Sequence, residues 1–320
     1  MAEQWLRRCK LKVQKKQGGE EALDLSDFKI YAHISQATAD APKAAEIYIY
    51  NLSTNTMNAL AGEDNENLSA TVTLEVGYQS TPLELLFKGQ VFQYRRGRDN
   101  EVDTWLCILC QSGDHLKTHA VVNQCVPAGT TIDEAGKVLV AETAKHEIEQ
   151  GEIPPLSDQA YPRGRVFFGG LYTHLEQFYN ENNVFLDVDD GILAAHTYMG
   201  YRIEPMIVLN RKTGMIGMPQ LTMQGLEVTC LLNPKLKRGL RVQVDMTNMQ
   251  TEAYDIAYGQ QGVDQPQKNP NLATNAGGIF IIQSIESVLD NRGNDWYSKL
   301  ICTAVGATVP KSGISITAVD

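Results

Sequence analysis

Several separated stretches of this chain alternate between apolar and polar residues, and this pattern constrains the fold more than any other feature of the sequence. In the first stretch, Cys9, Leu11 and Val13 fall on one face and mostly basic residues fall on the other. The same period of two recurs over residues 46–52 and 71–78. Because successive side chains of a strand point to opposite faces of its sheet, these stretches predict antiparallel strands with one buried face.

A predicted hairpin follows these strands. Residues 85–94 form one expected arm, residues 103–110 form the returning arm, and the polar run 95–100 connects them. Residues 1–115 are therefore expected to form one β-barrel or β-sandwich module.

The middle of the chain changes to a helical period. A capping-box pattern begins at Thr131 ahead of an apolar face, and apolar residues recur at helical spacing over residues 171–178. One hairpin is expected, with arms at residues 184–187 and 192–195 and its turn at residues 189–191. Residues 116–220 are therefore predicted to form a small α/β insertion module.

The alternating pattern returns from about residue 221. It covers residues 228–245 and a hairpin with arms at 279–289 and 295–303. A second β-barrel module is predicted over residues 221–309, and residues 310–320 are expected to form a C-terminal tail. The fold class is thus mainly β, with two similar β-barrel modules and a small α/β insertion.

The closing hairpins of the two β modules resemble each other. Each returning arm begins with an acidic residue near a tryptophan and carries a cysteine near its end, as seen in Asp103, Trp105 and Cys110 and in Asp295, Trp296 and Cys302. This similarity predicts an internal duplication of one β module. Two unrelated amphipathic hairpins would share much of the same pattern, so chance similarity is the alternative.

Residues 258–278 form a long segment rich in Gly, Gln, Asn and Pro between two predicted strands. Loops of this length are uncommon inside compact domains. Two interpretations remain open: a surface loop without a partner, or a segment that a partner orders.

Charge and composition exclude some functions. The formal net charge is −10, from 28 basic and 38 acidic residues, which disfavours a nucleic-acid-coating surface. A negative net charge fits both an acidic channel wall that DNA slides past and ordinary solubility.

No apolar run reaches the roughly 18 residues that span a bilayer, and no apolar run follows the basic N-terminus, so neither membrane insertion nor a cleaved signal is expected. The six scattered cysteines fit a reducing compartment.

Tests for chemistry predict no catalytic, cofactor-binding or metal-binding residue. A zinc-like spacing joins Cys107 and Cys110 to two histidines, but the two thiols should lie on opposite faces of a strand. The acidic residues around Asp189 hint at a calcium loop, yet the full ligand spacing is absent and a solvated hairpin turn is expected instead. No phosphate-binding loop or nucleophile motif occurs.

Two segments carry a resemblance to a known family. Residues 209–236 contain LNRKTGMIGMPQ and, after it, VTCLLNPKL, and residues 45–53 read AEIYIYNLS. Together with the hairpin over residues 89–113, they resemble the baseplate hub proteins of contractile-tailed bacteriophages, including those of Mu-like phages. The similar segments occur in the same order over most of the chain.

The resemblance implies a homotrimer in which two barrel modules per subunit make six similar units around a channel. Such a ring would join a six-fold tail tube to a three-fold central spike. The implied partners are the spike protein, the tail tube protein or a tube initiator, and other baseplate proteins, with genomic DNA only passing through. The expected location is the tail baseplate of the virion, assembled in the host cytoplasm. Because no repetitive β-helix pattern follows Thr303, the spike is expected to be a separate chain.

The predicted ring strands and the long loop supply the candidate interface residues. These are Tyr48, Tyr50, Asn51, Thr73, Glu75, Arg241, Gln243, Tyr258, Gln260 and Asn269. We hypothesise that the chain is a structural protein without enzyme activity. Two alternatives are a tail-associated cell-wall hydrolase, which scattered carboxylates would serve if they converge, and a monomeric carbohydrate- or protein-binding module.

Overall fold

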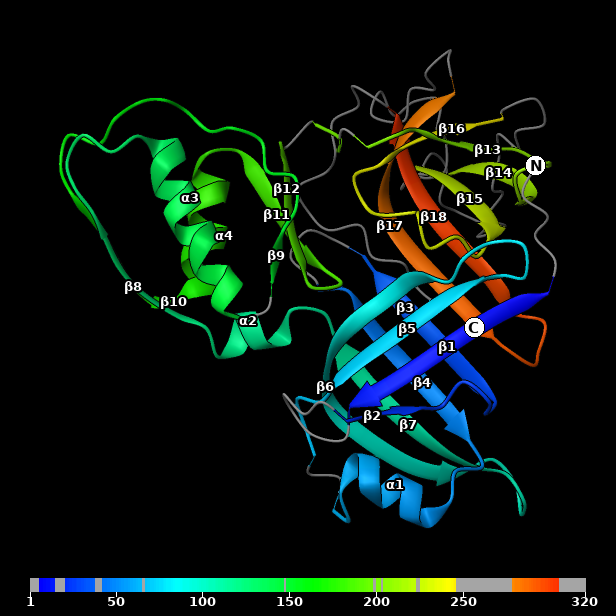
Figure 1. Ribbon diagram of the computed structural model, residues 1–320. Coiled ribbons are helices and arrows are strands. Elements are labelled where there is room, and N and C mark those ends of the chain that lie inside the picture. Colours follow the sequence, from blue (N-terminus) through cyan, green and yellow to red (C-terminus); the bar gives the residue numbers. More distant parts are fainter. Residues whose placement is uncertain are drawn as a thin grey trace, which may run out of the picture.

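The computed structural model describes residues 6–14, 21–37, 42–64, 67–146, 148–197, 200–202, 204–222, 225–245 and 278–304. These residues form a mainly β protein, which confirms the mainly β character that the sequence predicts. Two strand-rich parts lie against each other, and a smaller lobe with helices projects from one side of them (Figure 1). No helix within the described ranges is long and apolar enough to span a membrane.

Among the described residues, the first β module contains one helix and seven strands. Its elements are β1 (Arg7–Gln14), β2 (Ala22–Asp24), β3 (Ile30–Gln36), β4 (Ala44–Tyr50), α1 (Thr54–Ala61), β5 (Thr71–Tyr78), β6 (Glu84–Arg98) and β7 (Thr104–Gln111). Helix α1 has no counterpart in the sequence prediction. It starts at Ser53, whose hydroxyl accepts a hydrogen bond from the backbone N–H of Thr56 and so caps the first turn.

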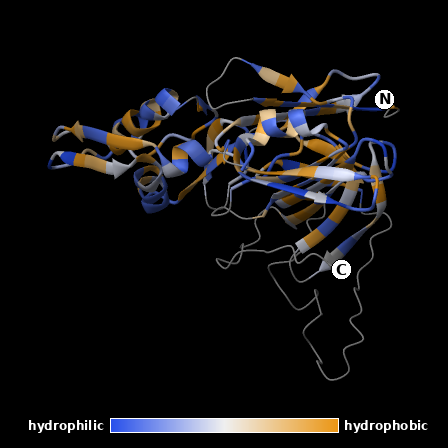
Figure 2. Cartoon of the chain, turned by 90° about the horizontal axis from the view of Figure 1, so that it is seen from below, coloured by the Kyte–Doolittle hydropathy of each residue, from blue (hydrophilic) through white to orange (hydrophobic). Residues whose placement is uncertain are grey.

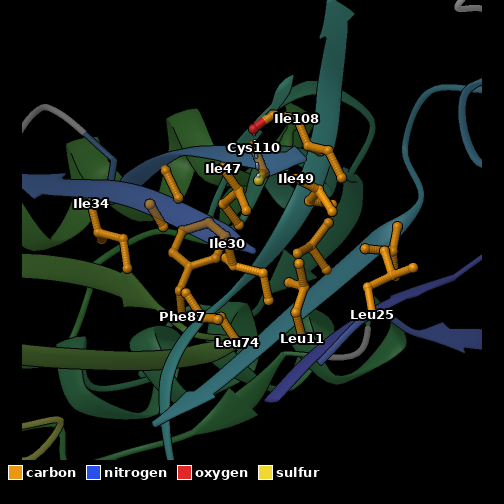
Figure 3. Close-up of a cluster of buried hydrophobic side chains, with 14 of the residues drawn as sticks. Leu11, Leu25, Ile30, Ile34, Ile47, Ile49, Leu74, Phe87, Ile108 and Cys110 are labelled. Carbon is orange, nitrogen blue, oxygen red and sulfur yellow. Dashed lines mark hydrogen bonds between the residues drawn. The ribbon is translucent and has the colours of Figure 1, made fainter. Parts of the chain in front are cut away.

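The core of this module lies between two layers of its folded sheet. Side chains from β1, β5 and β6, including Leu11, Leu74 and Phe87, point toward Ile30 and Ile47 from β3 and β4 (Figure 3). All five are fully buried. Their positions are those that the period of two predicts, because every second residue of each strand faces this core.

The hairpin of β6 and β7 differs from the prediction in its connection. Strand β6 continues through the polar run to Arg98, so the turn shifts to residues 99–103. The prediction of a connection at residues 95–100 was wrong because polar residues at an exposed strand end look like a loop in sequence. Gly97 fits here because the ring of Trp105 occupies the space that a Cβ atom would need.

The α/β module follows as α2 (Asp114–Thr118), β8 (Val121–Val126), α3 (Ile132–Thr143), η1 (Ala144–His146), β9 (Glu149–Gln150), β10 (Arg165–Gly170), α4 (Leu171–Glu181), β11 (Val184–Asp189) and β12 (Ile192–Thr197). Both predicted helices and the predicted hairpin are present. Thr131 and Glu134 form the expected capping box. The module has its own core, to which Leu139, Leu175 and Phe178 contribute.

The second β module consists of β13 (Ile207–Leu209), β14 (Met215–Thr222), β15 (Gly225–Leu231), β16 (Arg241–Val244), β17 (Ile279–Asp290) and β18 (Trp296–Ala304). The expected boundary at residue 220 falls within β14, which pairs with β15, and β13 pairs with β16. We therefore propose that the second module begins near residue 207. A third core lies within it.

Five strands of each β module lie in the same order. In the first module they lie side by side as β3-β4-β7-β6-β5, and in the second as β14-β15-β18-β17-β16. When these five strands are numbered along the chain, with β1, β2 and β13 left out, each set has the order first, second, fifth, fourth, third. Cys110 pairs with Val91 directly before a bulge in β6, and Cys302 pairs with Ile282 directly before a bulge in β17. This shared irregularity places the two cysteines at equivalent positions and supports the predicted duplication.

The two tryptophans are not equivalent, although the hairpin comparison pairs them. Counted from the cysteines, the counterpart of Trp105 is Tyr297, and both rings lie half-buried on the face of the sheet away from the core. Trp296 is instead buried in the first module's core. The tryptophan part of the sequence match was therefore wrong by one position, which exchanges the two faces of a strand.

Strand β17 joins the modules into one 13-stranded sheet. Its first part pairs with β16 of its own module, and residues 285–290 pair with β3 of the first module. Figure 1 shows β17 running from β16 toward β3. Strand β3, the first of the five shared strands in the first module, is thus hydrogen-bonded to β17, the fourth of the five in the second.

Candidate functional site

Tyr48 and Tyr50 lie on the face of β4 that points away from the core. The hydroxyl of Tyr48 donates a hydrogen bond to Glu46 (2.7 Å), and its ring centroid lies 5.3 Å from that of Trp105. Burial and the neighbouring Glu46 carboxylate raise the pKa of Tyr48. The ammonium group of Lys29 lies 4.4 Å from the ring centroid of Tyr50. Both tyrosines are therefore held in place by neighbours.

Asn51 links the end of β4 to the start of β7. Its side-chain amide donates to Asp103 (3.0 Å) and its side-chain oxygen accepts from the backbone N–H of Thr104 (3.0 Å). Its φ of 59° lies in the left-handed region, which asparagine tolerates better than most residues. These contacts give Asn51 a structural role in the turn.

The other predicted interface residues lie on different surfaces. Thr73 and Glu75 are on the outer face of β5, opposite Lys12 and Lys10 of β1, and thus on the other layer of the folded sheet from Tyr48. Arg241 and Gln243 lie on β16, where Arg241 stacks on Tyr201 at 4.2 Å. The structure does not bring these residues together. Tyr258, Gln260 and Asn269 lie outside the described residues.

A continuous half-buried face crosses both β modules, and the sequence prediction identified only part of it. Tyr31 and His33 of β3 lie beside Tyr48 on this face, and Tyr31 is 6.2 Å from the ring centroid of Tyr48. His33 lies 2.7 Å from Glu286 of β17, so a polar contact crosses the boundary between modules. Buried and half-buried residues alternate along β3 as they do along β4, so the same period of two in the sequence could have predicted this strand.

A cluster of charged side chains joins all three modules, and we refer to Lys43, Asp187, Asp189, Asp190, Arg202 and Arg238 as the charged joint. The three aspartates come from the β11–β12 hairpin of the α/β module. The expectation of a solvated turn here was wrong, because all three are at least nine-tenths buried. The conformation of the turn is the one that an Asp-Gly pair favours. Asp190 and Gly191 both have positive φ, as a two-residue hairpin turn of type I′ requires.

The carboxylate of Asp190 binds the first β module. It accepts from the ammonium group of Lys43 (2.7 Å) and from the backbone N–H of Lys88 (3.0 Å). The backbone N–H of Asp190 donates to Ser112 (2.8 Å). The adjacent Asp189 accepts from the side chain of Gln36 at 2.7 Å. This end of the hairpin is therefore fixed to residues near β3, β6 and β7.

The carboxylate of Asp187 binds Arg202, which precedes the second β module, and Arg238, which lies within it. It accepts hydrogen bonds from Arg238 and from Arg202, the latter at 3.4 Å, and Arg202 also reaches Asp189 at 3.3 Å. His196 lies 3.3 Å from Asp187. The two arginine side chains and the Asp187 side chain are all nearly inaccessible to solvent. Three cations thus face three carboxylates inside the protein.

Burial and charge act in opposite directions on these aspartates. Burial alone would raise the pKa of Asp187, but Arg238, His196 and Arg202 outweigh it and lower the pKa below the usual range. Burial and the neighbouring Asp187 carboxylate raise the pKa of Asp189. Asp187 is therefore the fixed negative charge of the joint.

The zinc-like spacing does not form a metal centre within the described ranges. Cys110 is packed in the first core, whereas Cys107 faces Glu46 on the opposite side of β7. Burial, assisted by Glu46, raises the pKa of Cys107 to about 12, which disfavours the thiolate that a metal requires. Across the described part of the chain, no group of three or more His, Cys, Asp or Glu side chains is placed to hold a metal ion.

An apolar patch lies at the free end of the helical lobe. Strands β8 and β10 pair only with each other among the described residues, and their outer face exposes Val121, Val166 and Phe168 by 72%, 64% and 74%. Figure 2 shows hydrophobic segments on these strands, away from the large sheet. The exposed residues of this face are Val121, Asn123, Cys125, Val166, Phe168 and Gly170, and none of them is charged.

Comparisons with known proteins agree with this architecture. The family model described as baseplate hub gp41 matches residues 8–256. No match is found among curated protein sequences. Two similar solved structures are a tail protein from Neisseria meningitidis MC58 (11% identity, TM-score 0.53, covering 95% of this chain and 98% of that one) and the 43 kDa tail protein of prophage MuSo2 from Shewanella oneidensis (9%, 0.56, 94% and 98%).

A third similar structure is the Escherichia coli c3393 protein, described as a component of the type VI secretion system with structural similarity to the T4 tail proteins gp27 and gp5. It is 10% identical with a TM-score of 0.53, and the match covers 94% of this chain and 80% of that one. At these identities, the likeness concerns the fold.

Proposed function

The chain belongs to the baseplate hub gp41 family and is a structural component of a phage tail baseplate, and on this premise we propose that three copies close into a ring that joins the tail tube to the central spike. In this ring the two β modules of each chain would act as two similar units. Three chains would then present six units to a six-fold tube and three equal sectors to a three-fold spike.

The observation that carries this proposal is the repeated strand order of the two β modules, including the bulge and the buried cysteine at equivalent positions. An adaptor between symmetries needs two similar units in one chain. A binding module that acts as a monomer has no such requirement.

The proposed mechanism is mechanical. Contacts between neighbouring sheets would close the ring and cover sheet edges that would otherwise be exposed to aggregation. The charged joint holds the α/β module against both β modules, which supports a rigid subunit. The net charge of −10 fits a channel that genomic DNA passes without binding.

A role without enzyme activity fits the chemistry of the described residues. The carboxylates that gather in the charged joint are paired with cations and buried. Burial raises the pKa of the thiols of Cys9, Cys107 and Cys230 to about 12. Groups in these states are poorly suited to act as acids, bases or nucleophiles at neutral pH.

We propose a separate spike chain, the tail tube protein or a tube initiator, and other baseplate proteins as partners, with assembly in the host cytoplasm and no membrane insertion. The predicted interface residues Tyr48, Tyr50, Thr73, Glu75, Arg241 and Gln243 remain candidates for these contacts, as does the segment 258–278. Because they lie on different surfaces, they would serve different partners. Deleting residues 258–278 should impair assembly with the spike or tube and leave both β modules folded.

The mass and symmetry of the purified full-length protein test the proposal. Light scattering after gel filtration should give a trimer, and electron microscopy should show an end view with six similar lobes around a hole. If the protein alone is a monomer, the same measurements are repeated with the spike chain. Absence of a ring under both conditions would refute the proposed function.

A further inference from the structure

Four aromatic side chains gather on the half-buried face that crosses both β modules, and we refer to them as the aromatic cluster. Tyr31 of β3 lies opposite Tyr48 of β4, with ring centroids 6.2 Å apart. The ring of Trp105 on β7 lies 5.3 Å from that of Tyr48, and Tyr50 lies opposite Trp105 in the strand register. All four residues stay partly accessible to solvent. They therefore present a continuous aromatic surface on one face of the sheet.

Carboxylates surround the hydroxyl groups of the three tyrosines in this cluster. Glu46 accepts the hydroxyl hydrogen bond of Tyr48 at 2.7 Å. Burial is the main cause of the raised pKa values of Tyr31 and Tyr50, and neighbouring carboxylates raise them further. The carboxylates near the three hydroxyl groups are Glu46, Asp99, Asp290 and Asp295. The aromatic surface is thus bordered by negative charge.

One cation of the chain already contacts this cluster. The ammonium group of Lys29 lies 4.4 Å from the ring centroid of Tyr50. A cation over an aromatic ring is attracted by the negative face of the ring, and nearby carboxylates add to the attraction. Among the described cations, none lies over the ring of Tyr31 or Tyr48. These two rings are therefore open to a cation from another molecule.

Three other cations, on the same face or in the turn that borders it, have partners inside the chain. They are Arg95, which donates to Gln93 at 3.1 Å, Arg292, which donates to the backbone carbonyl of Asp27 at 2.6 Å, and Lys299, which lies opposite Glu286. The exposed carboxylates of Asp99 and Asp295 form no ion pair with another described residue. Charge complementarity therefore favours a cationic partner and disfavours nucleic acid, whose phosphates would face these carboxylates.

The aromatic cluster extends across several strands, which fits a polypeptide better than a small cation. The residues of one row across the sheet are Asp290 of β17, Tyr31 of β3, Tyr48 of β4 and Cys107 of β7. At about 4.8 Å between neighbouring strands, this row spans about 14 Å. An extended peptide of about four residues covers the same distance. A small cation would cover one ring, whereas cationic side chains along a peptide reach several.

We propose that the aromatic cluster and its bordering carboxylates bind a polypeptide segment of a partner protein that carries Lys or Arg side chains at intervals. The cationic side chains lie over the open faces of Tyr31 and Tyr48, as Lys29 lies over Tyr50, and the carboxylates balance their charge. This inference goes beyond the proposed ring, because it concerns a face of the sheet and the chemistry of a partner, and it does not depend on ring closure.

Fluorescence anisotropy tests the inference with the full-length chain. The probe is a labelled short peptide that alternates Arg and Ser, and the matched probe alternates Glu and Ser. The Arg-Ser peptide should bind and the Glu-Ser peptide should not. Tyr31→Leu combined with Tyr48→Leu removes two rings and should weaken binding about five- to thirtyfold. The melting temperature of each variant shows whether it is folded.

Two single-charge variants separate this site from the general attraction of an acidic protein for a basic peptide. Asp295→Asn removes a carboxylate beside the cluster and should weaken binding about two- to fivefold. Asp158→Asn removes the same charge from an exposed loop of the α/β module and should leave binding unchanged. Equal losses from both variants would mean that only net charge attracts the peptide, and this would overturn the inference.

Three further outcomes would also overturn the inference: no binding of the Arg-Ser peptide, unchanged binding by the folded Tyr31→Leu/Tyr48→Leu variant, or tighter binding of a labelled DNA duplex than of the peptide. Light scattering on the same samples separates this result from the proposed function. A ring that does not bind the peptide leaves the proposed function intact, and site-specific binding by a protein that forms no ring supports this inference alone.

Discussion

The two β modules share a strand order but differ in what covers them. In the first module, β5 is flanked by antiparallel β1, and α1 adds Leu60 and Ala61 to the core. In the second module, β16, the counterpart of β5, is flanked by the short parallel strand β13. Strand β3 pairs with β17 as well as with β4, whereas its counterpart β14 pairs with β15 alone among the described strands. The same strand order therefore has different neighbours in the two modules.

Loss of Asp187 should have the largest effect and should show which module depends more on the charged joint. Asp187→Ala leaves Arg202 and Arg238 buried without their main carboxylate, and breaking a buried ion pair in this way costs about 3–5 kcal/mol. Urea unfolding measures the loss. Hydrogen exchange should show the greatest local loss of protection in the second β module.

Asp190→Ala is the matched control, because this carboxylate binds Lys43 and the backbone of Lys88 in the first module. Its loss of protection should fall mainly on the first β module. Identical exchange patterns for the two variants would mean that the joint acts on the whole sheet and that the two modules are not separable.

The acid response should separate Asp187 from Asp189. The lowered folded pKa of Asp187 stabilises the protein above the unfolded value of about 3.9, and this stabilisation is lost as pH falls below it. The raised pKa of Asp189 acts in the opposite sense, because the folded state binds that proton more tightly as pH falls. Between pH 7 and 3, the free energy of unfolding should fall least in Asp187→Asn and most in Asp189→Asn, with the unmodified protein between them. The reverse order would contradict these assignments.

The equivalent cysteines test whether the modules are duplicated in packing as well as in topology. Cys110→Ser and Cys302→Ser each place a hydroxyl in an apolar core at the residue opposite a bulge, at a cost of about 1–3 kcal/mol. Chemical denaturation of both variants measures the two losses, and each variant is the control for the other. A large loss at only one position would mean that the two cores have diverged in packing.

The residue pair next to the hairpin turn differs between the modules. Gly97 lies opposite Trp105 in the first, and Val288 lies opposite Tyr297 in the second. Gly97→Ala places a Cβ atom against the Trp105 ring and should cost about 1–3 kcal/mol in thermal or urea unfolding. The double variant with Trp105→Tyr should recover part of that loss, because in the second module a tyrosine at the equivalent position, Tyr297, lies opposite Val288, a residue that has a Cβ atom. No recovery would indicate that the strand backbone, not the ring, opposes the substitution.

The smallest effect is expected for the polar contact that crosses the modules. His33 and Glu286 lie 2.7 Å apart but the histidine side chain is about one-third exposed. A double-mutant cycle with His33→Gln and Glu286→Gln should give a coupling energy below about 1 kcal/mol. A much larger value would mean that this pair, and not strand pairing, fixes the two modules together.

Much of the strand pattern could be predicted because it depends on neighbours along the chain. Alternation identified β5 over Thr71–Tyr78 at its observed bounds, and the capping box identified the start of α3 at Thr131. Candidate interface residues were harder to predict. The pattern indicated that Tyr48 and Thr73 point away from a core, but only the folded sheet places them on different layers.

The sequence by itself determined which residues are buried in the strands with clear alternation, such as β1 and β5, and where α3 and α4 start. Those properties depend on the period of side chains along a backbone and on local hydrogen bonds. The tertiary structure alone decided that the aspartates of a hairpin turn are buried among Lys43, Arg202 and Arg238, and that β17 pairs with β3. These contacts join residues far apart in the chain, and an alternating strand specifies two faces but not the partner that each edge meets.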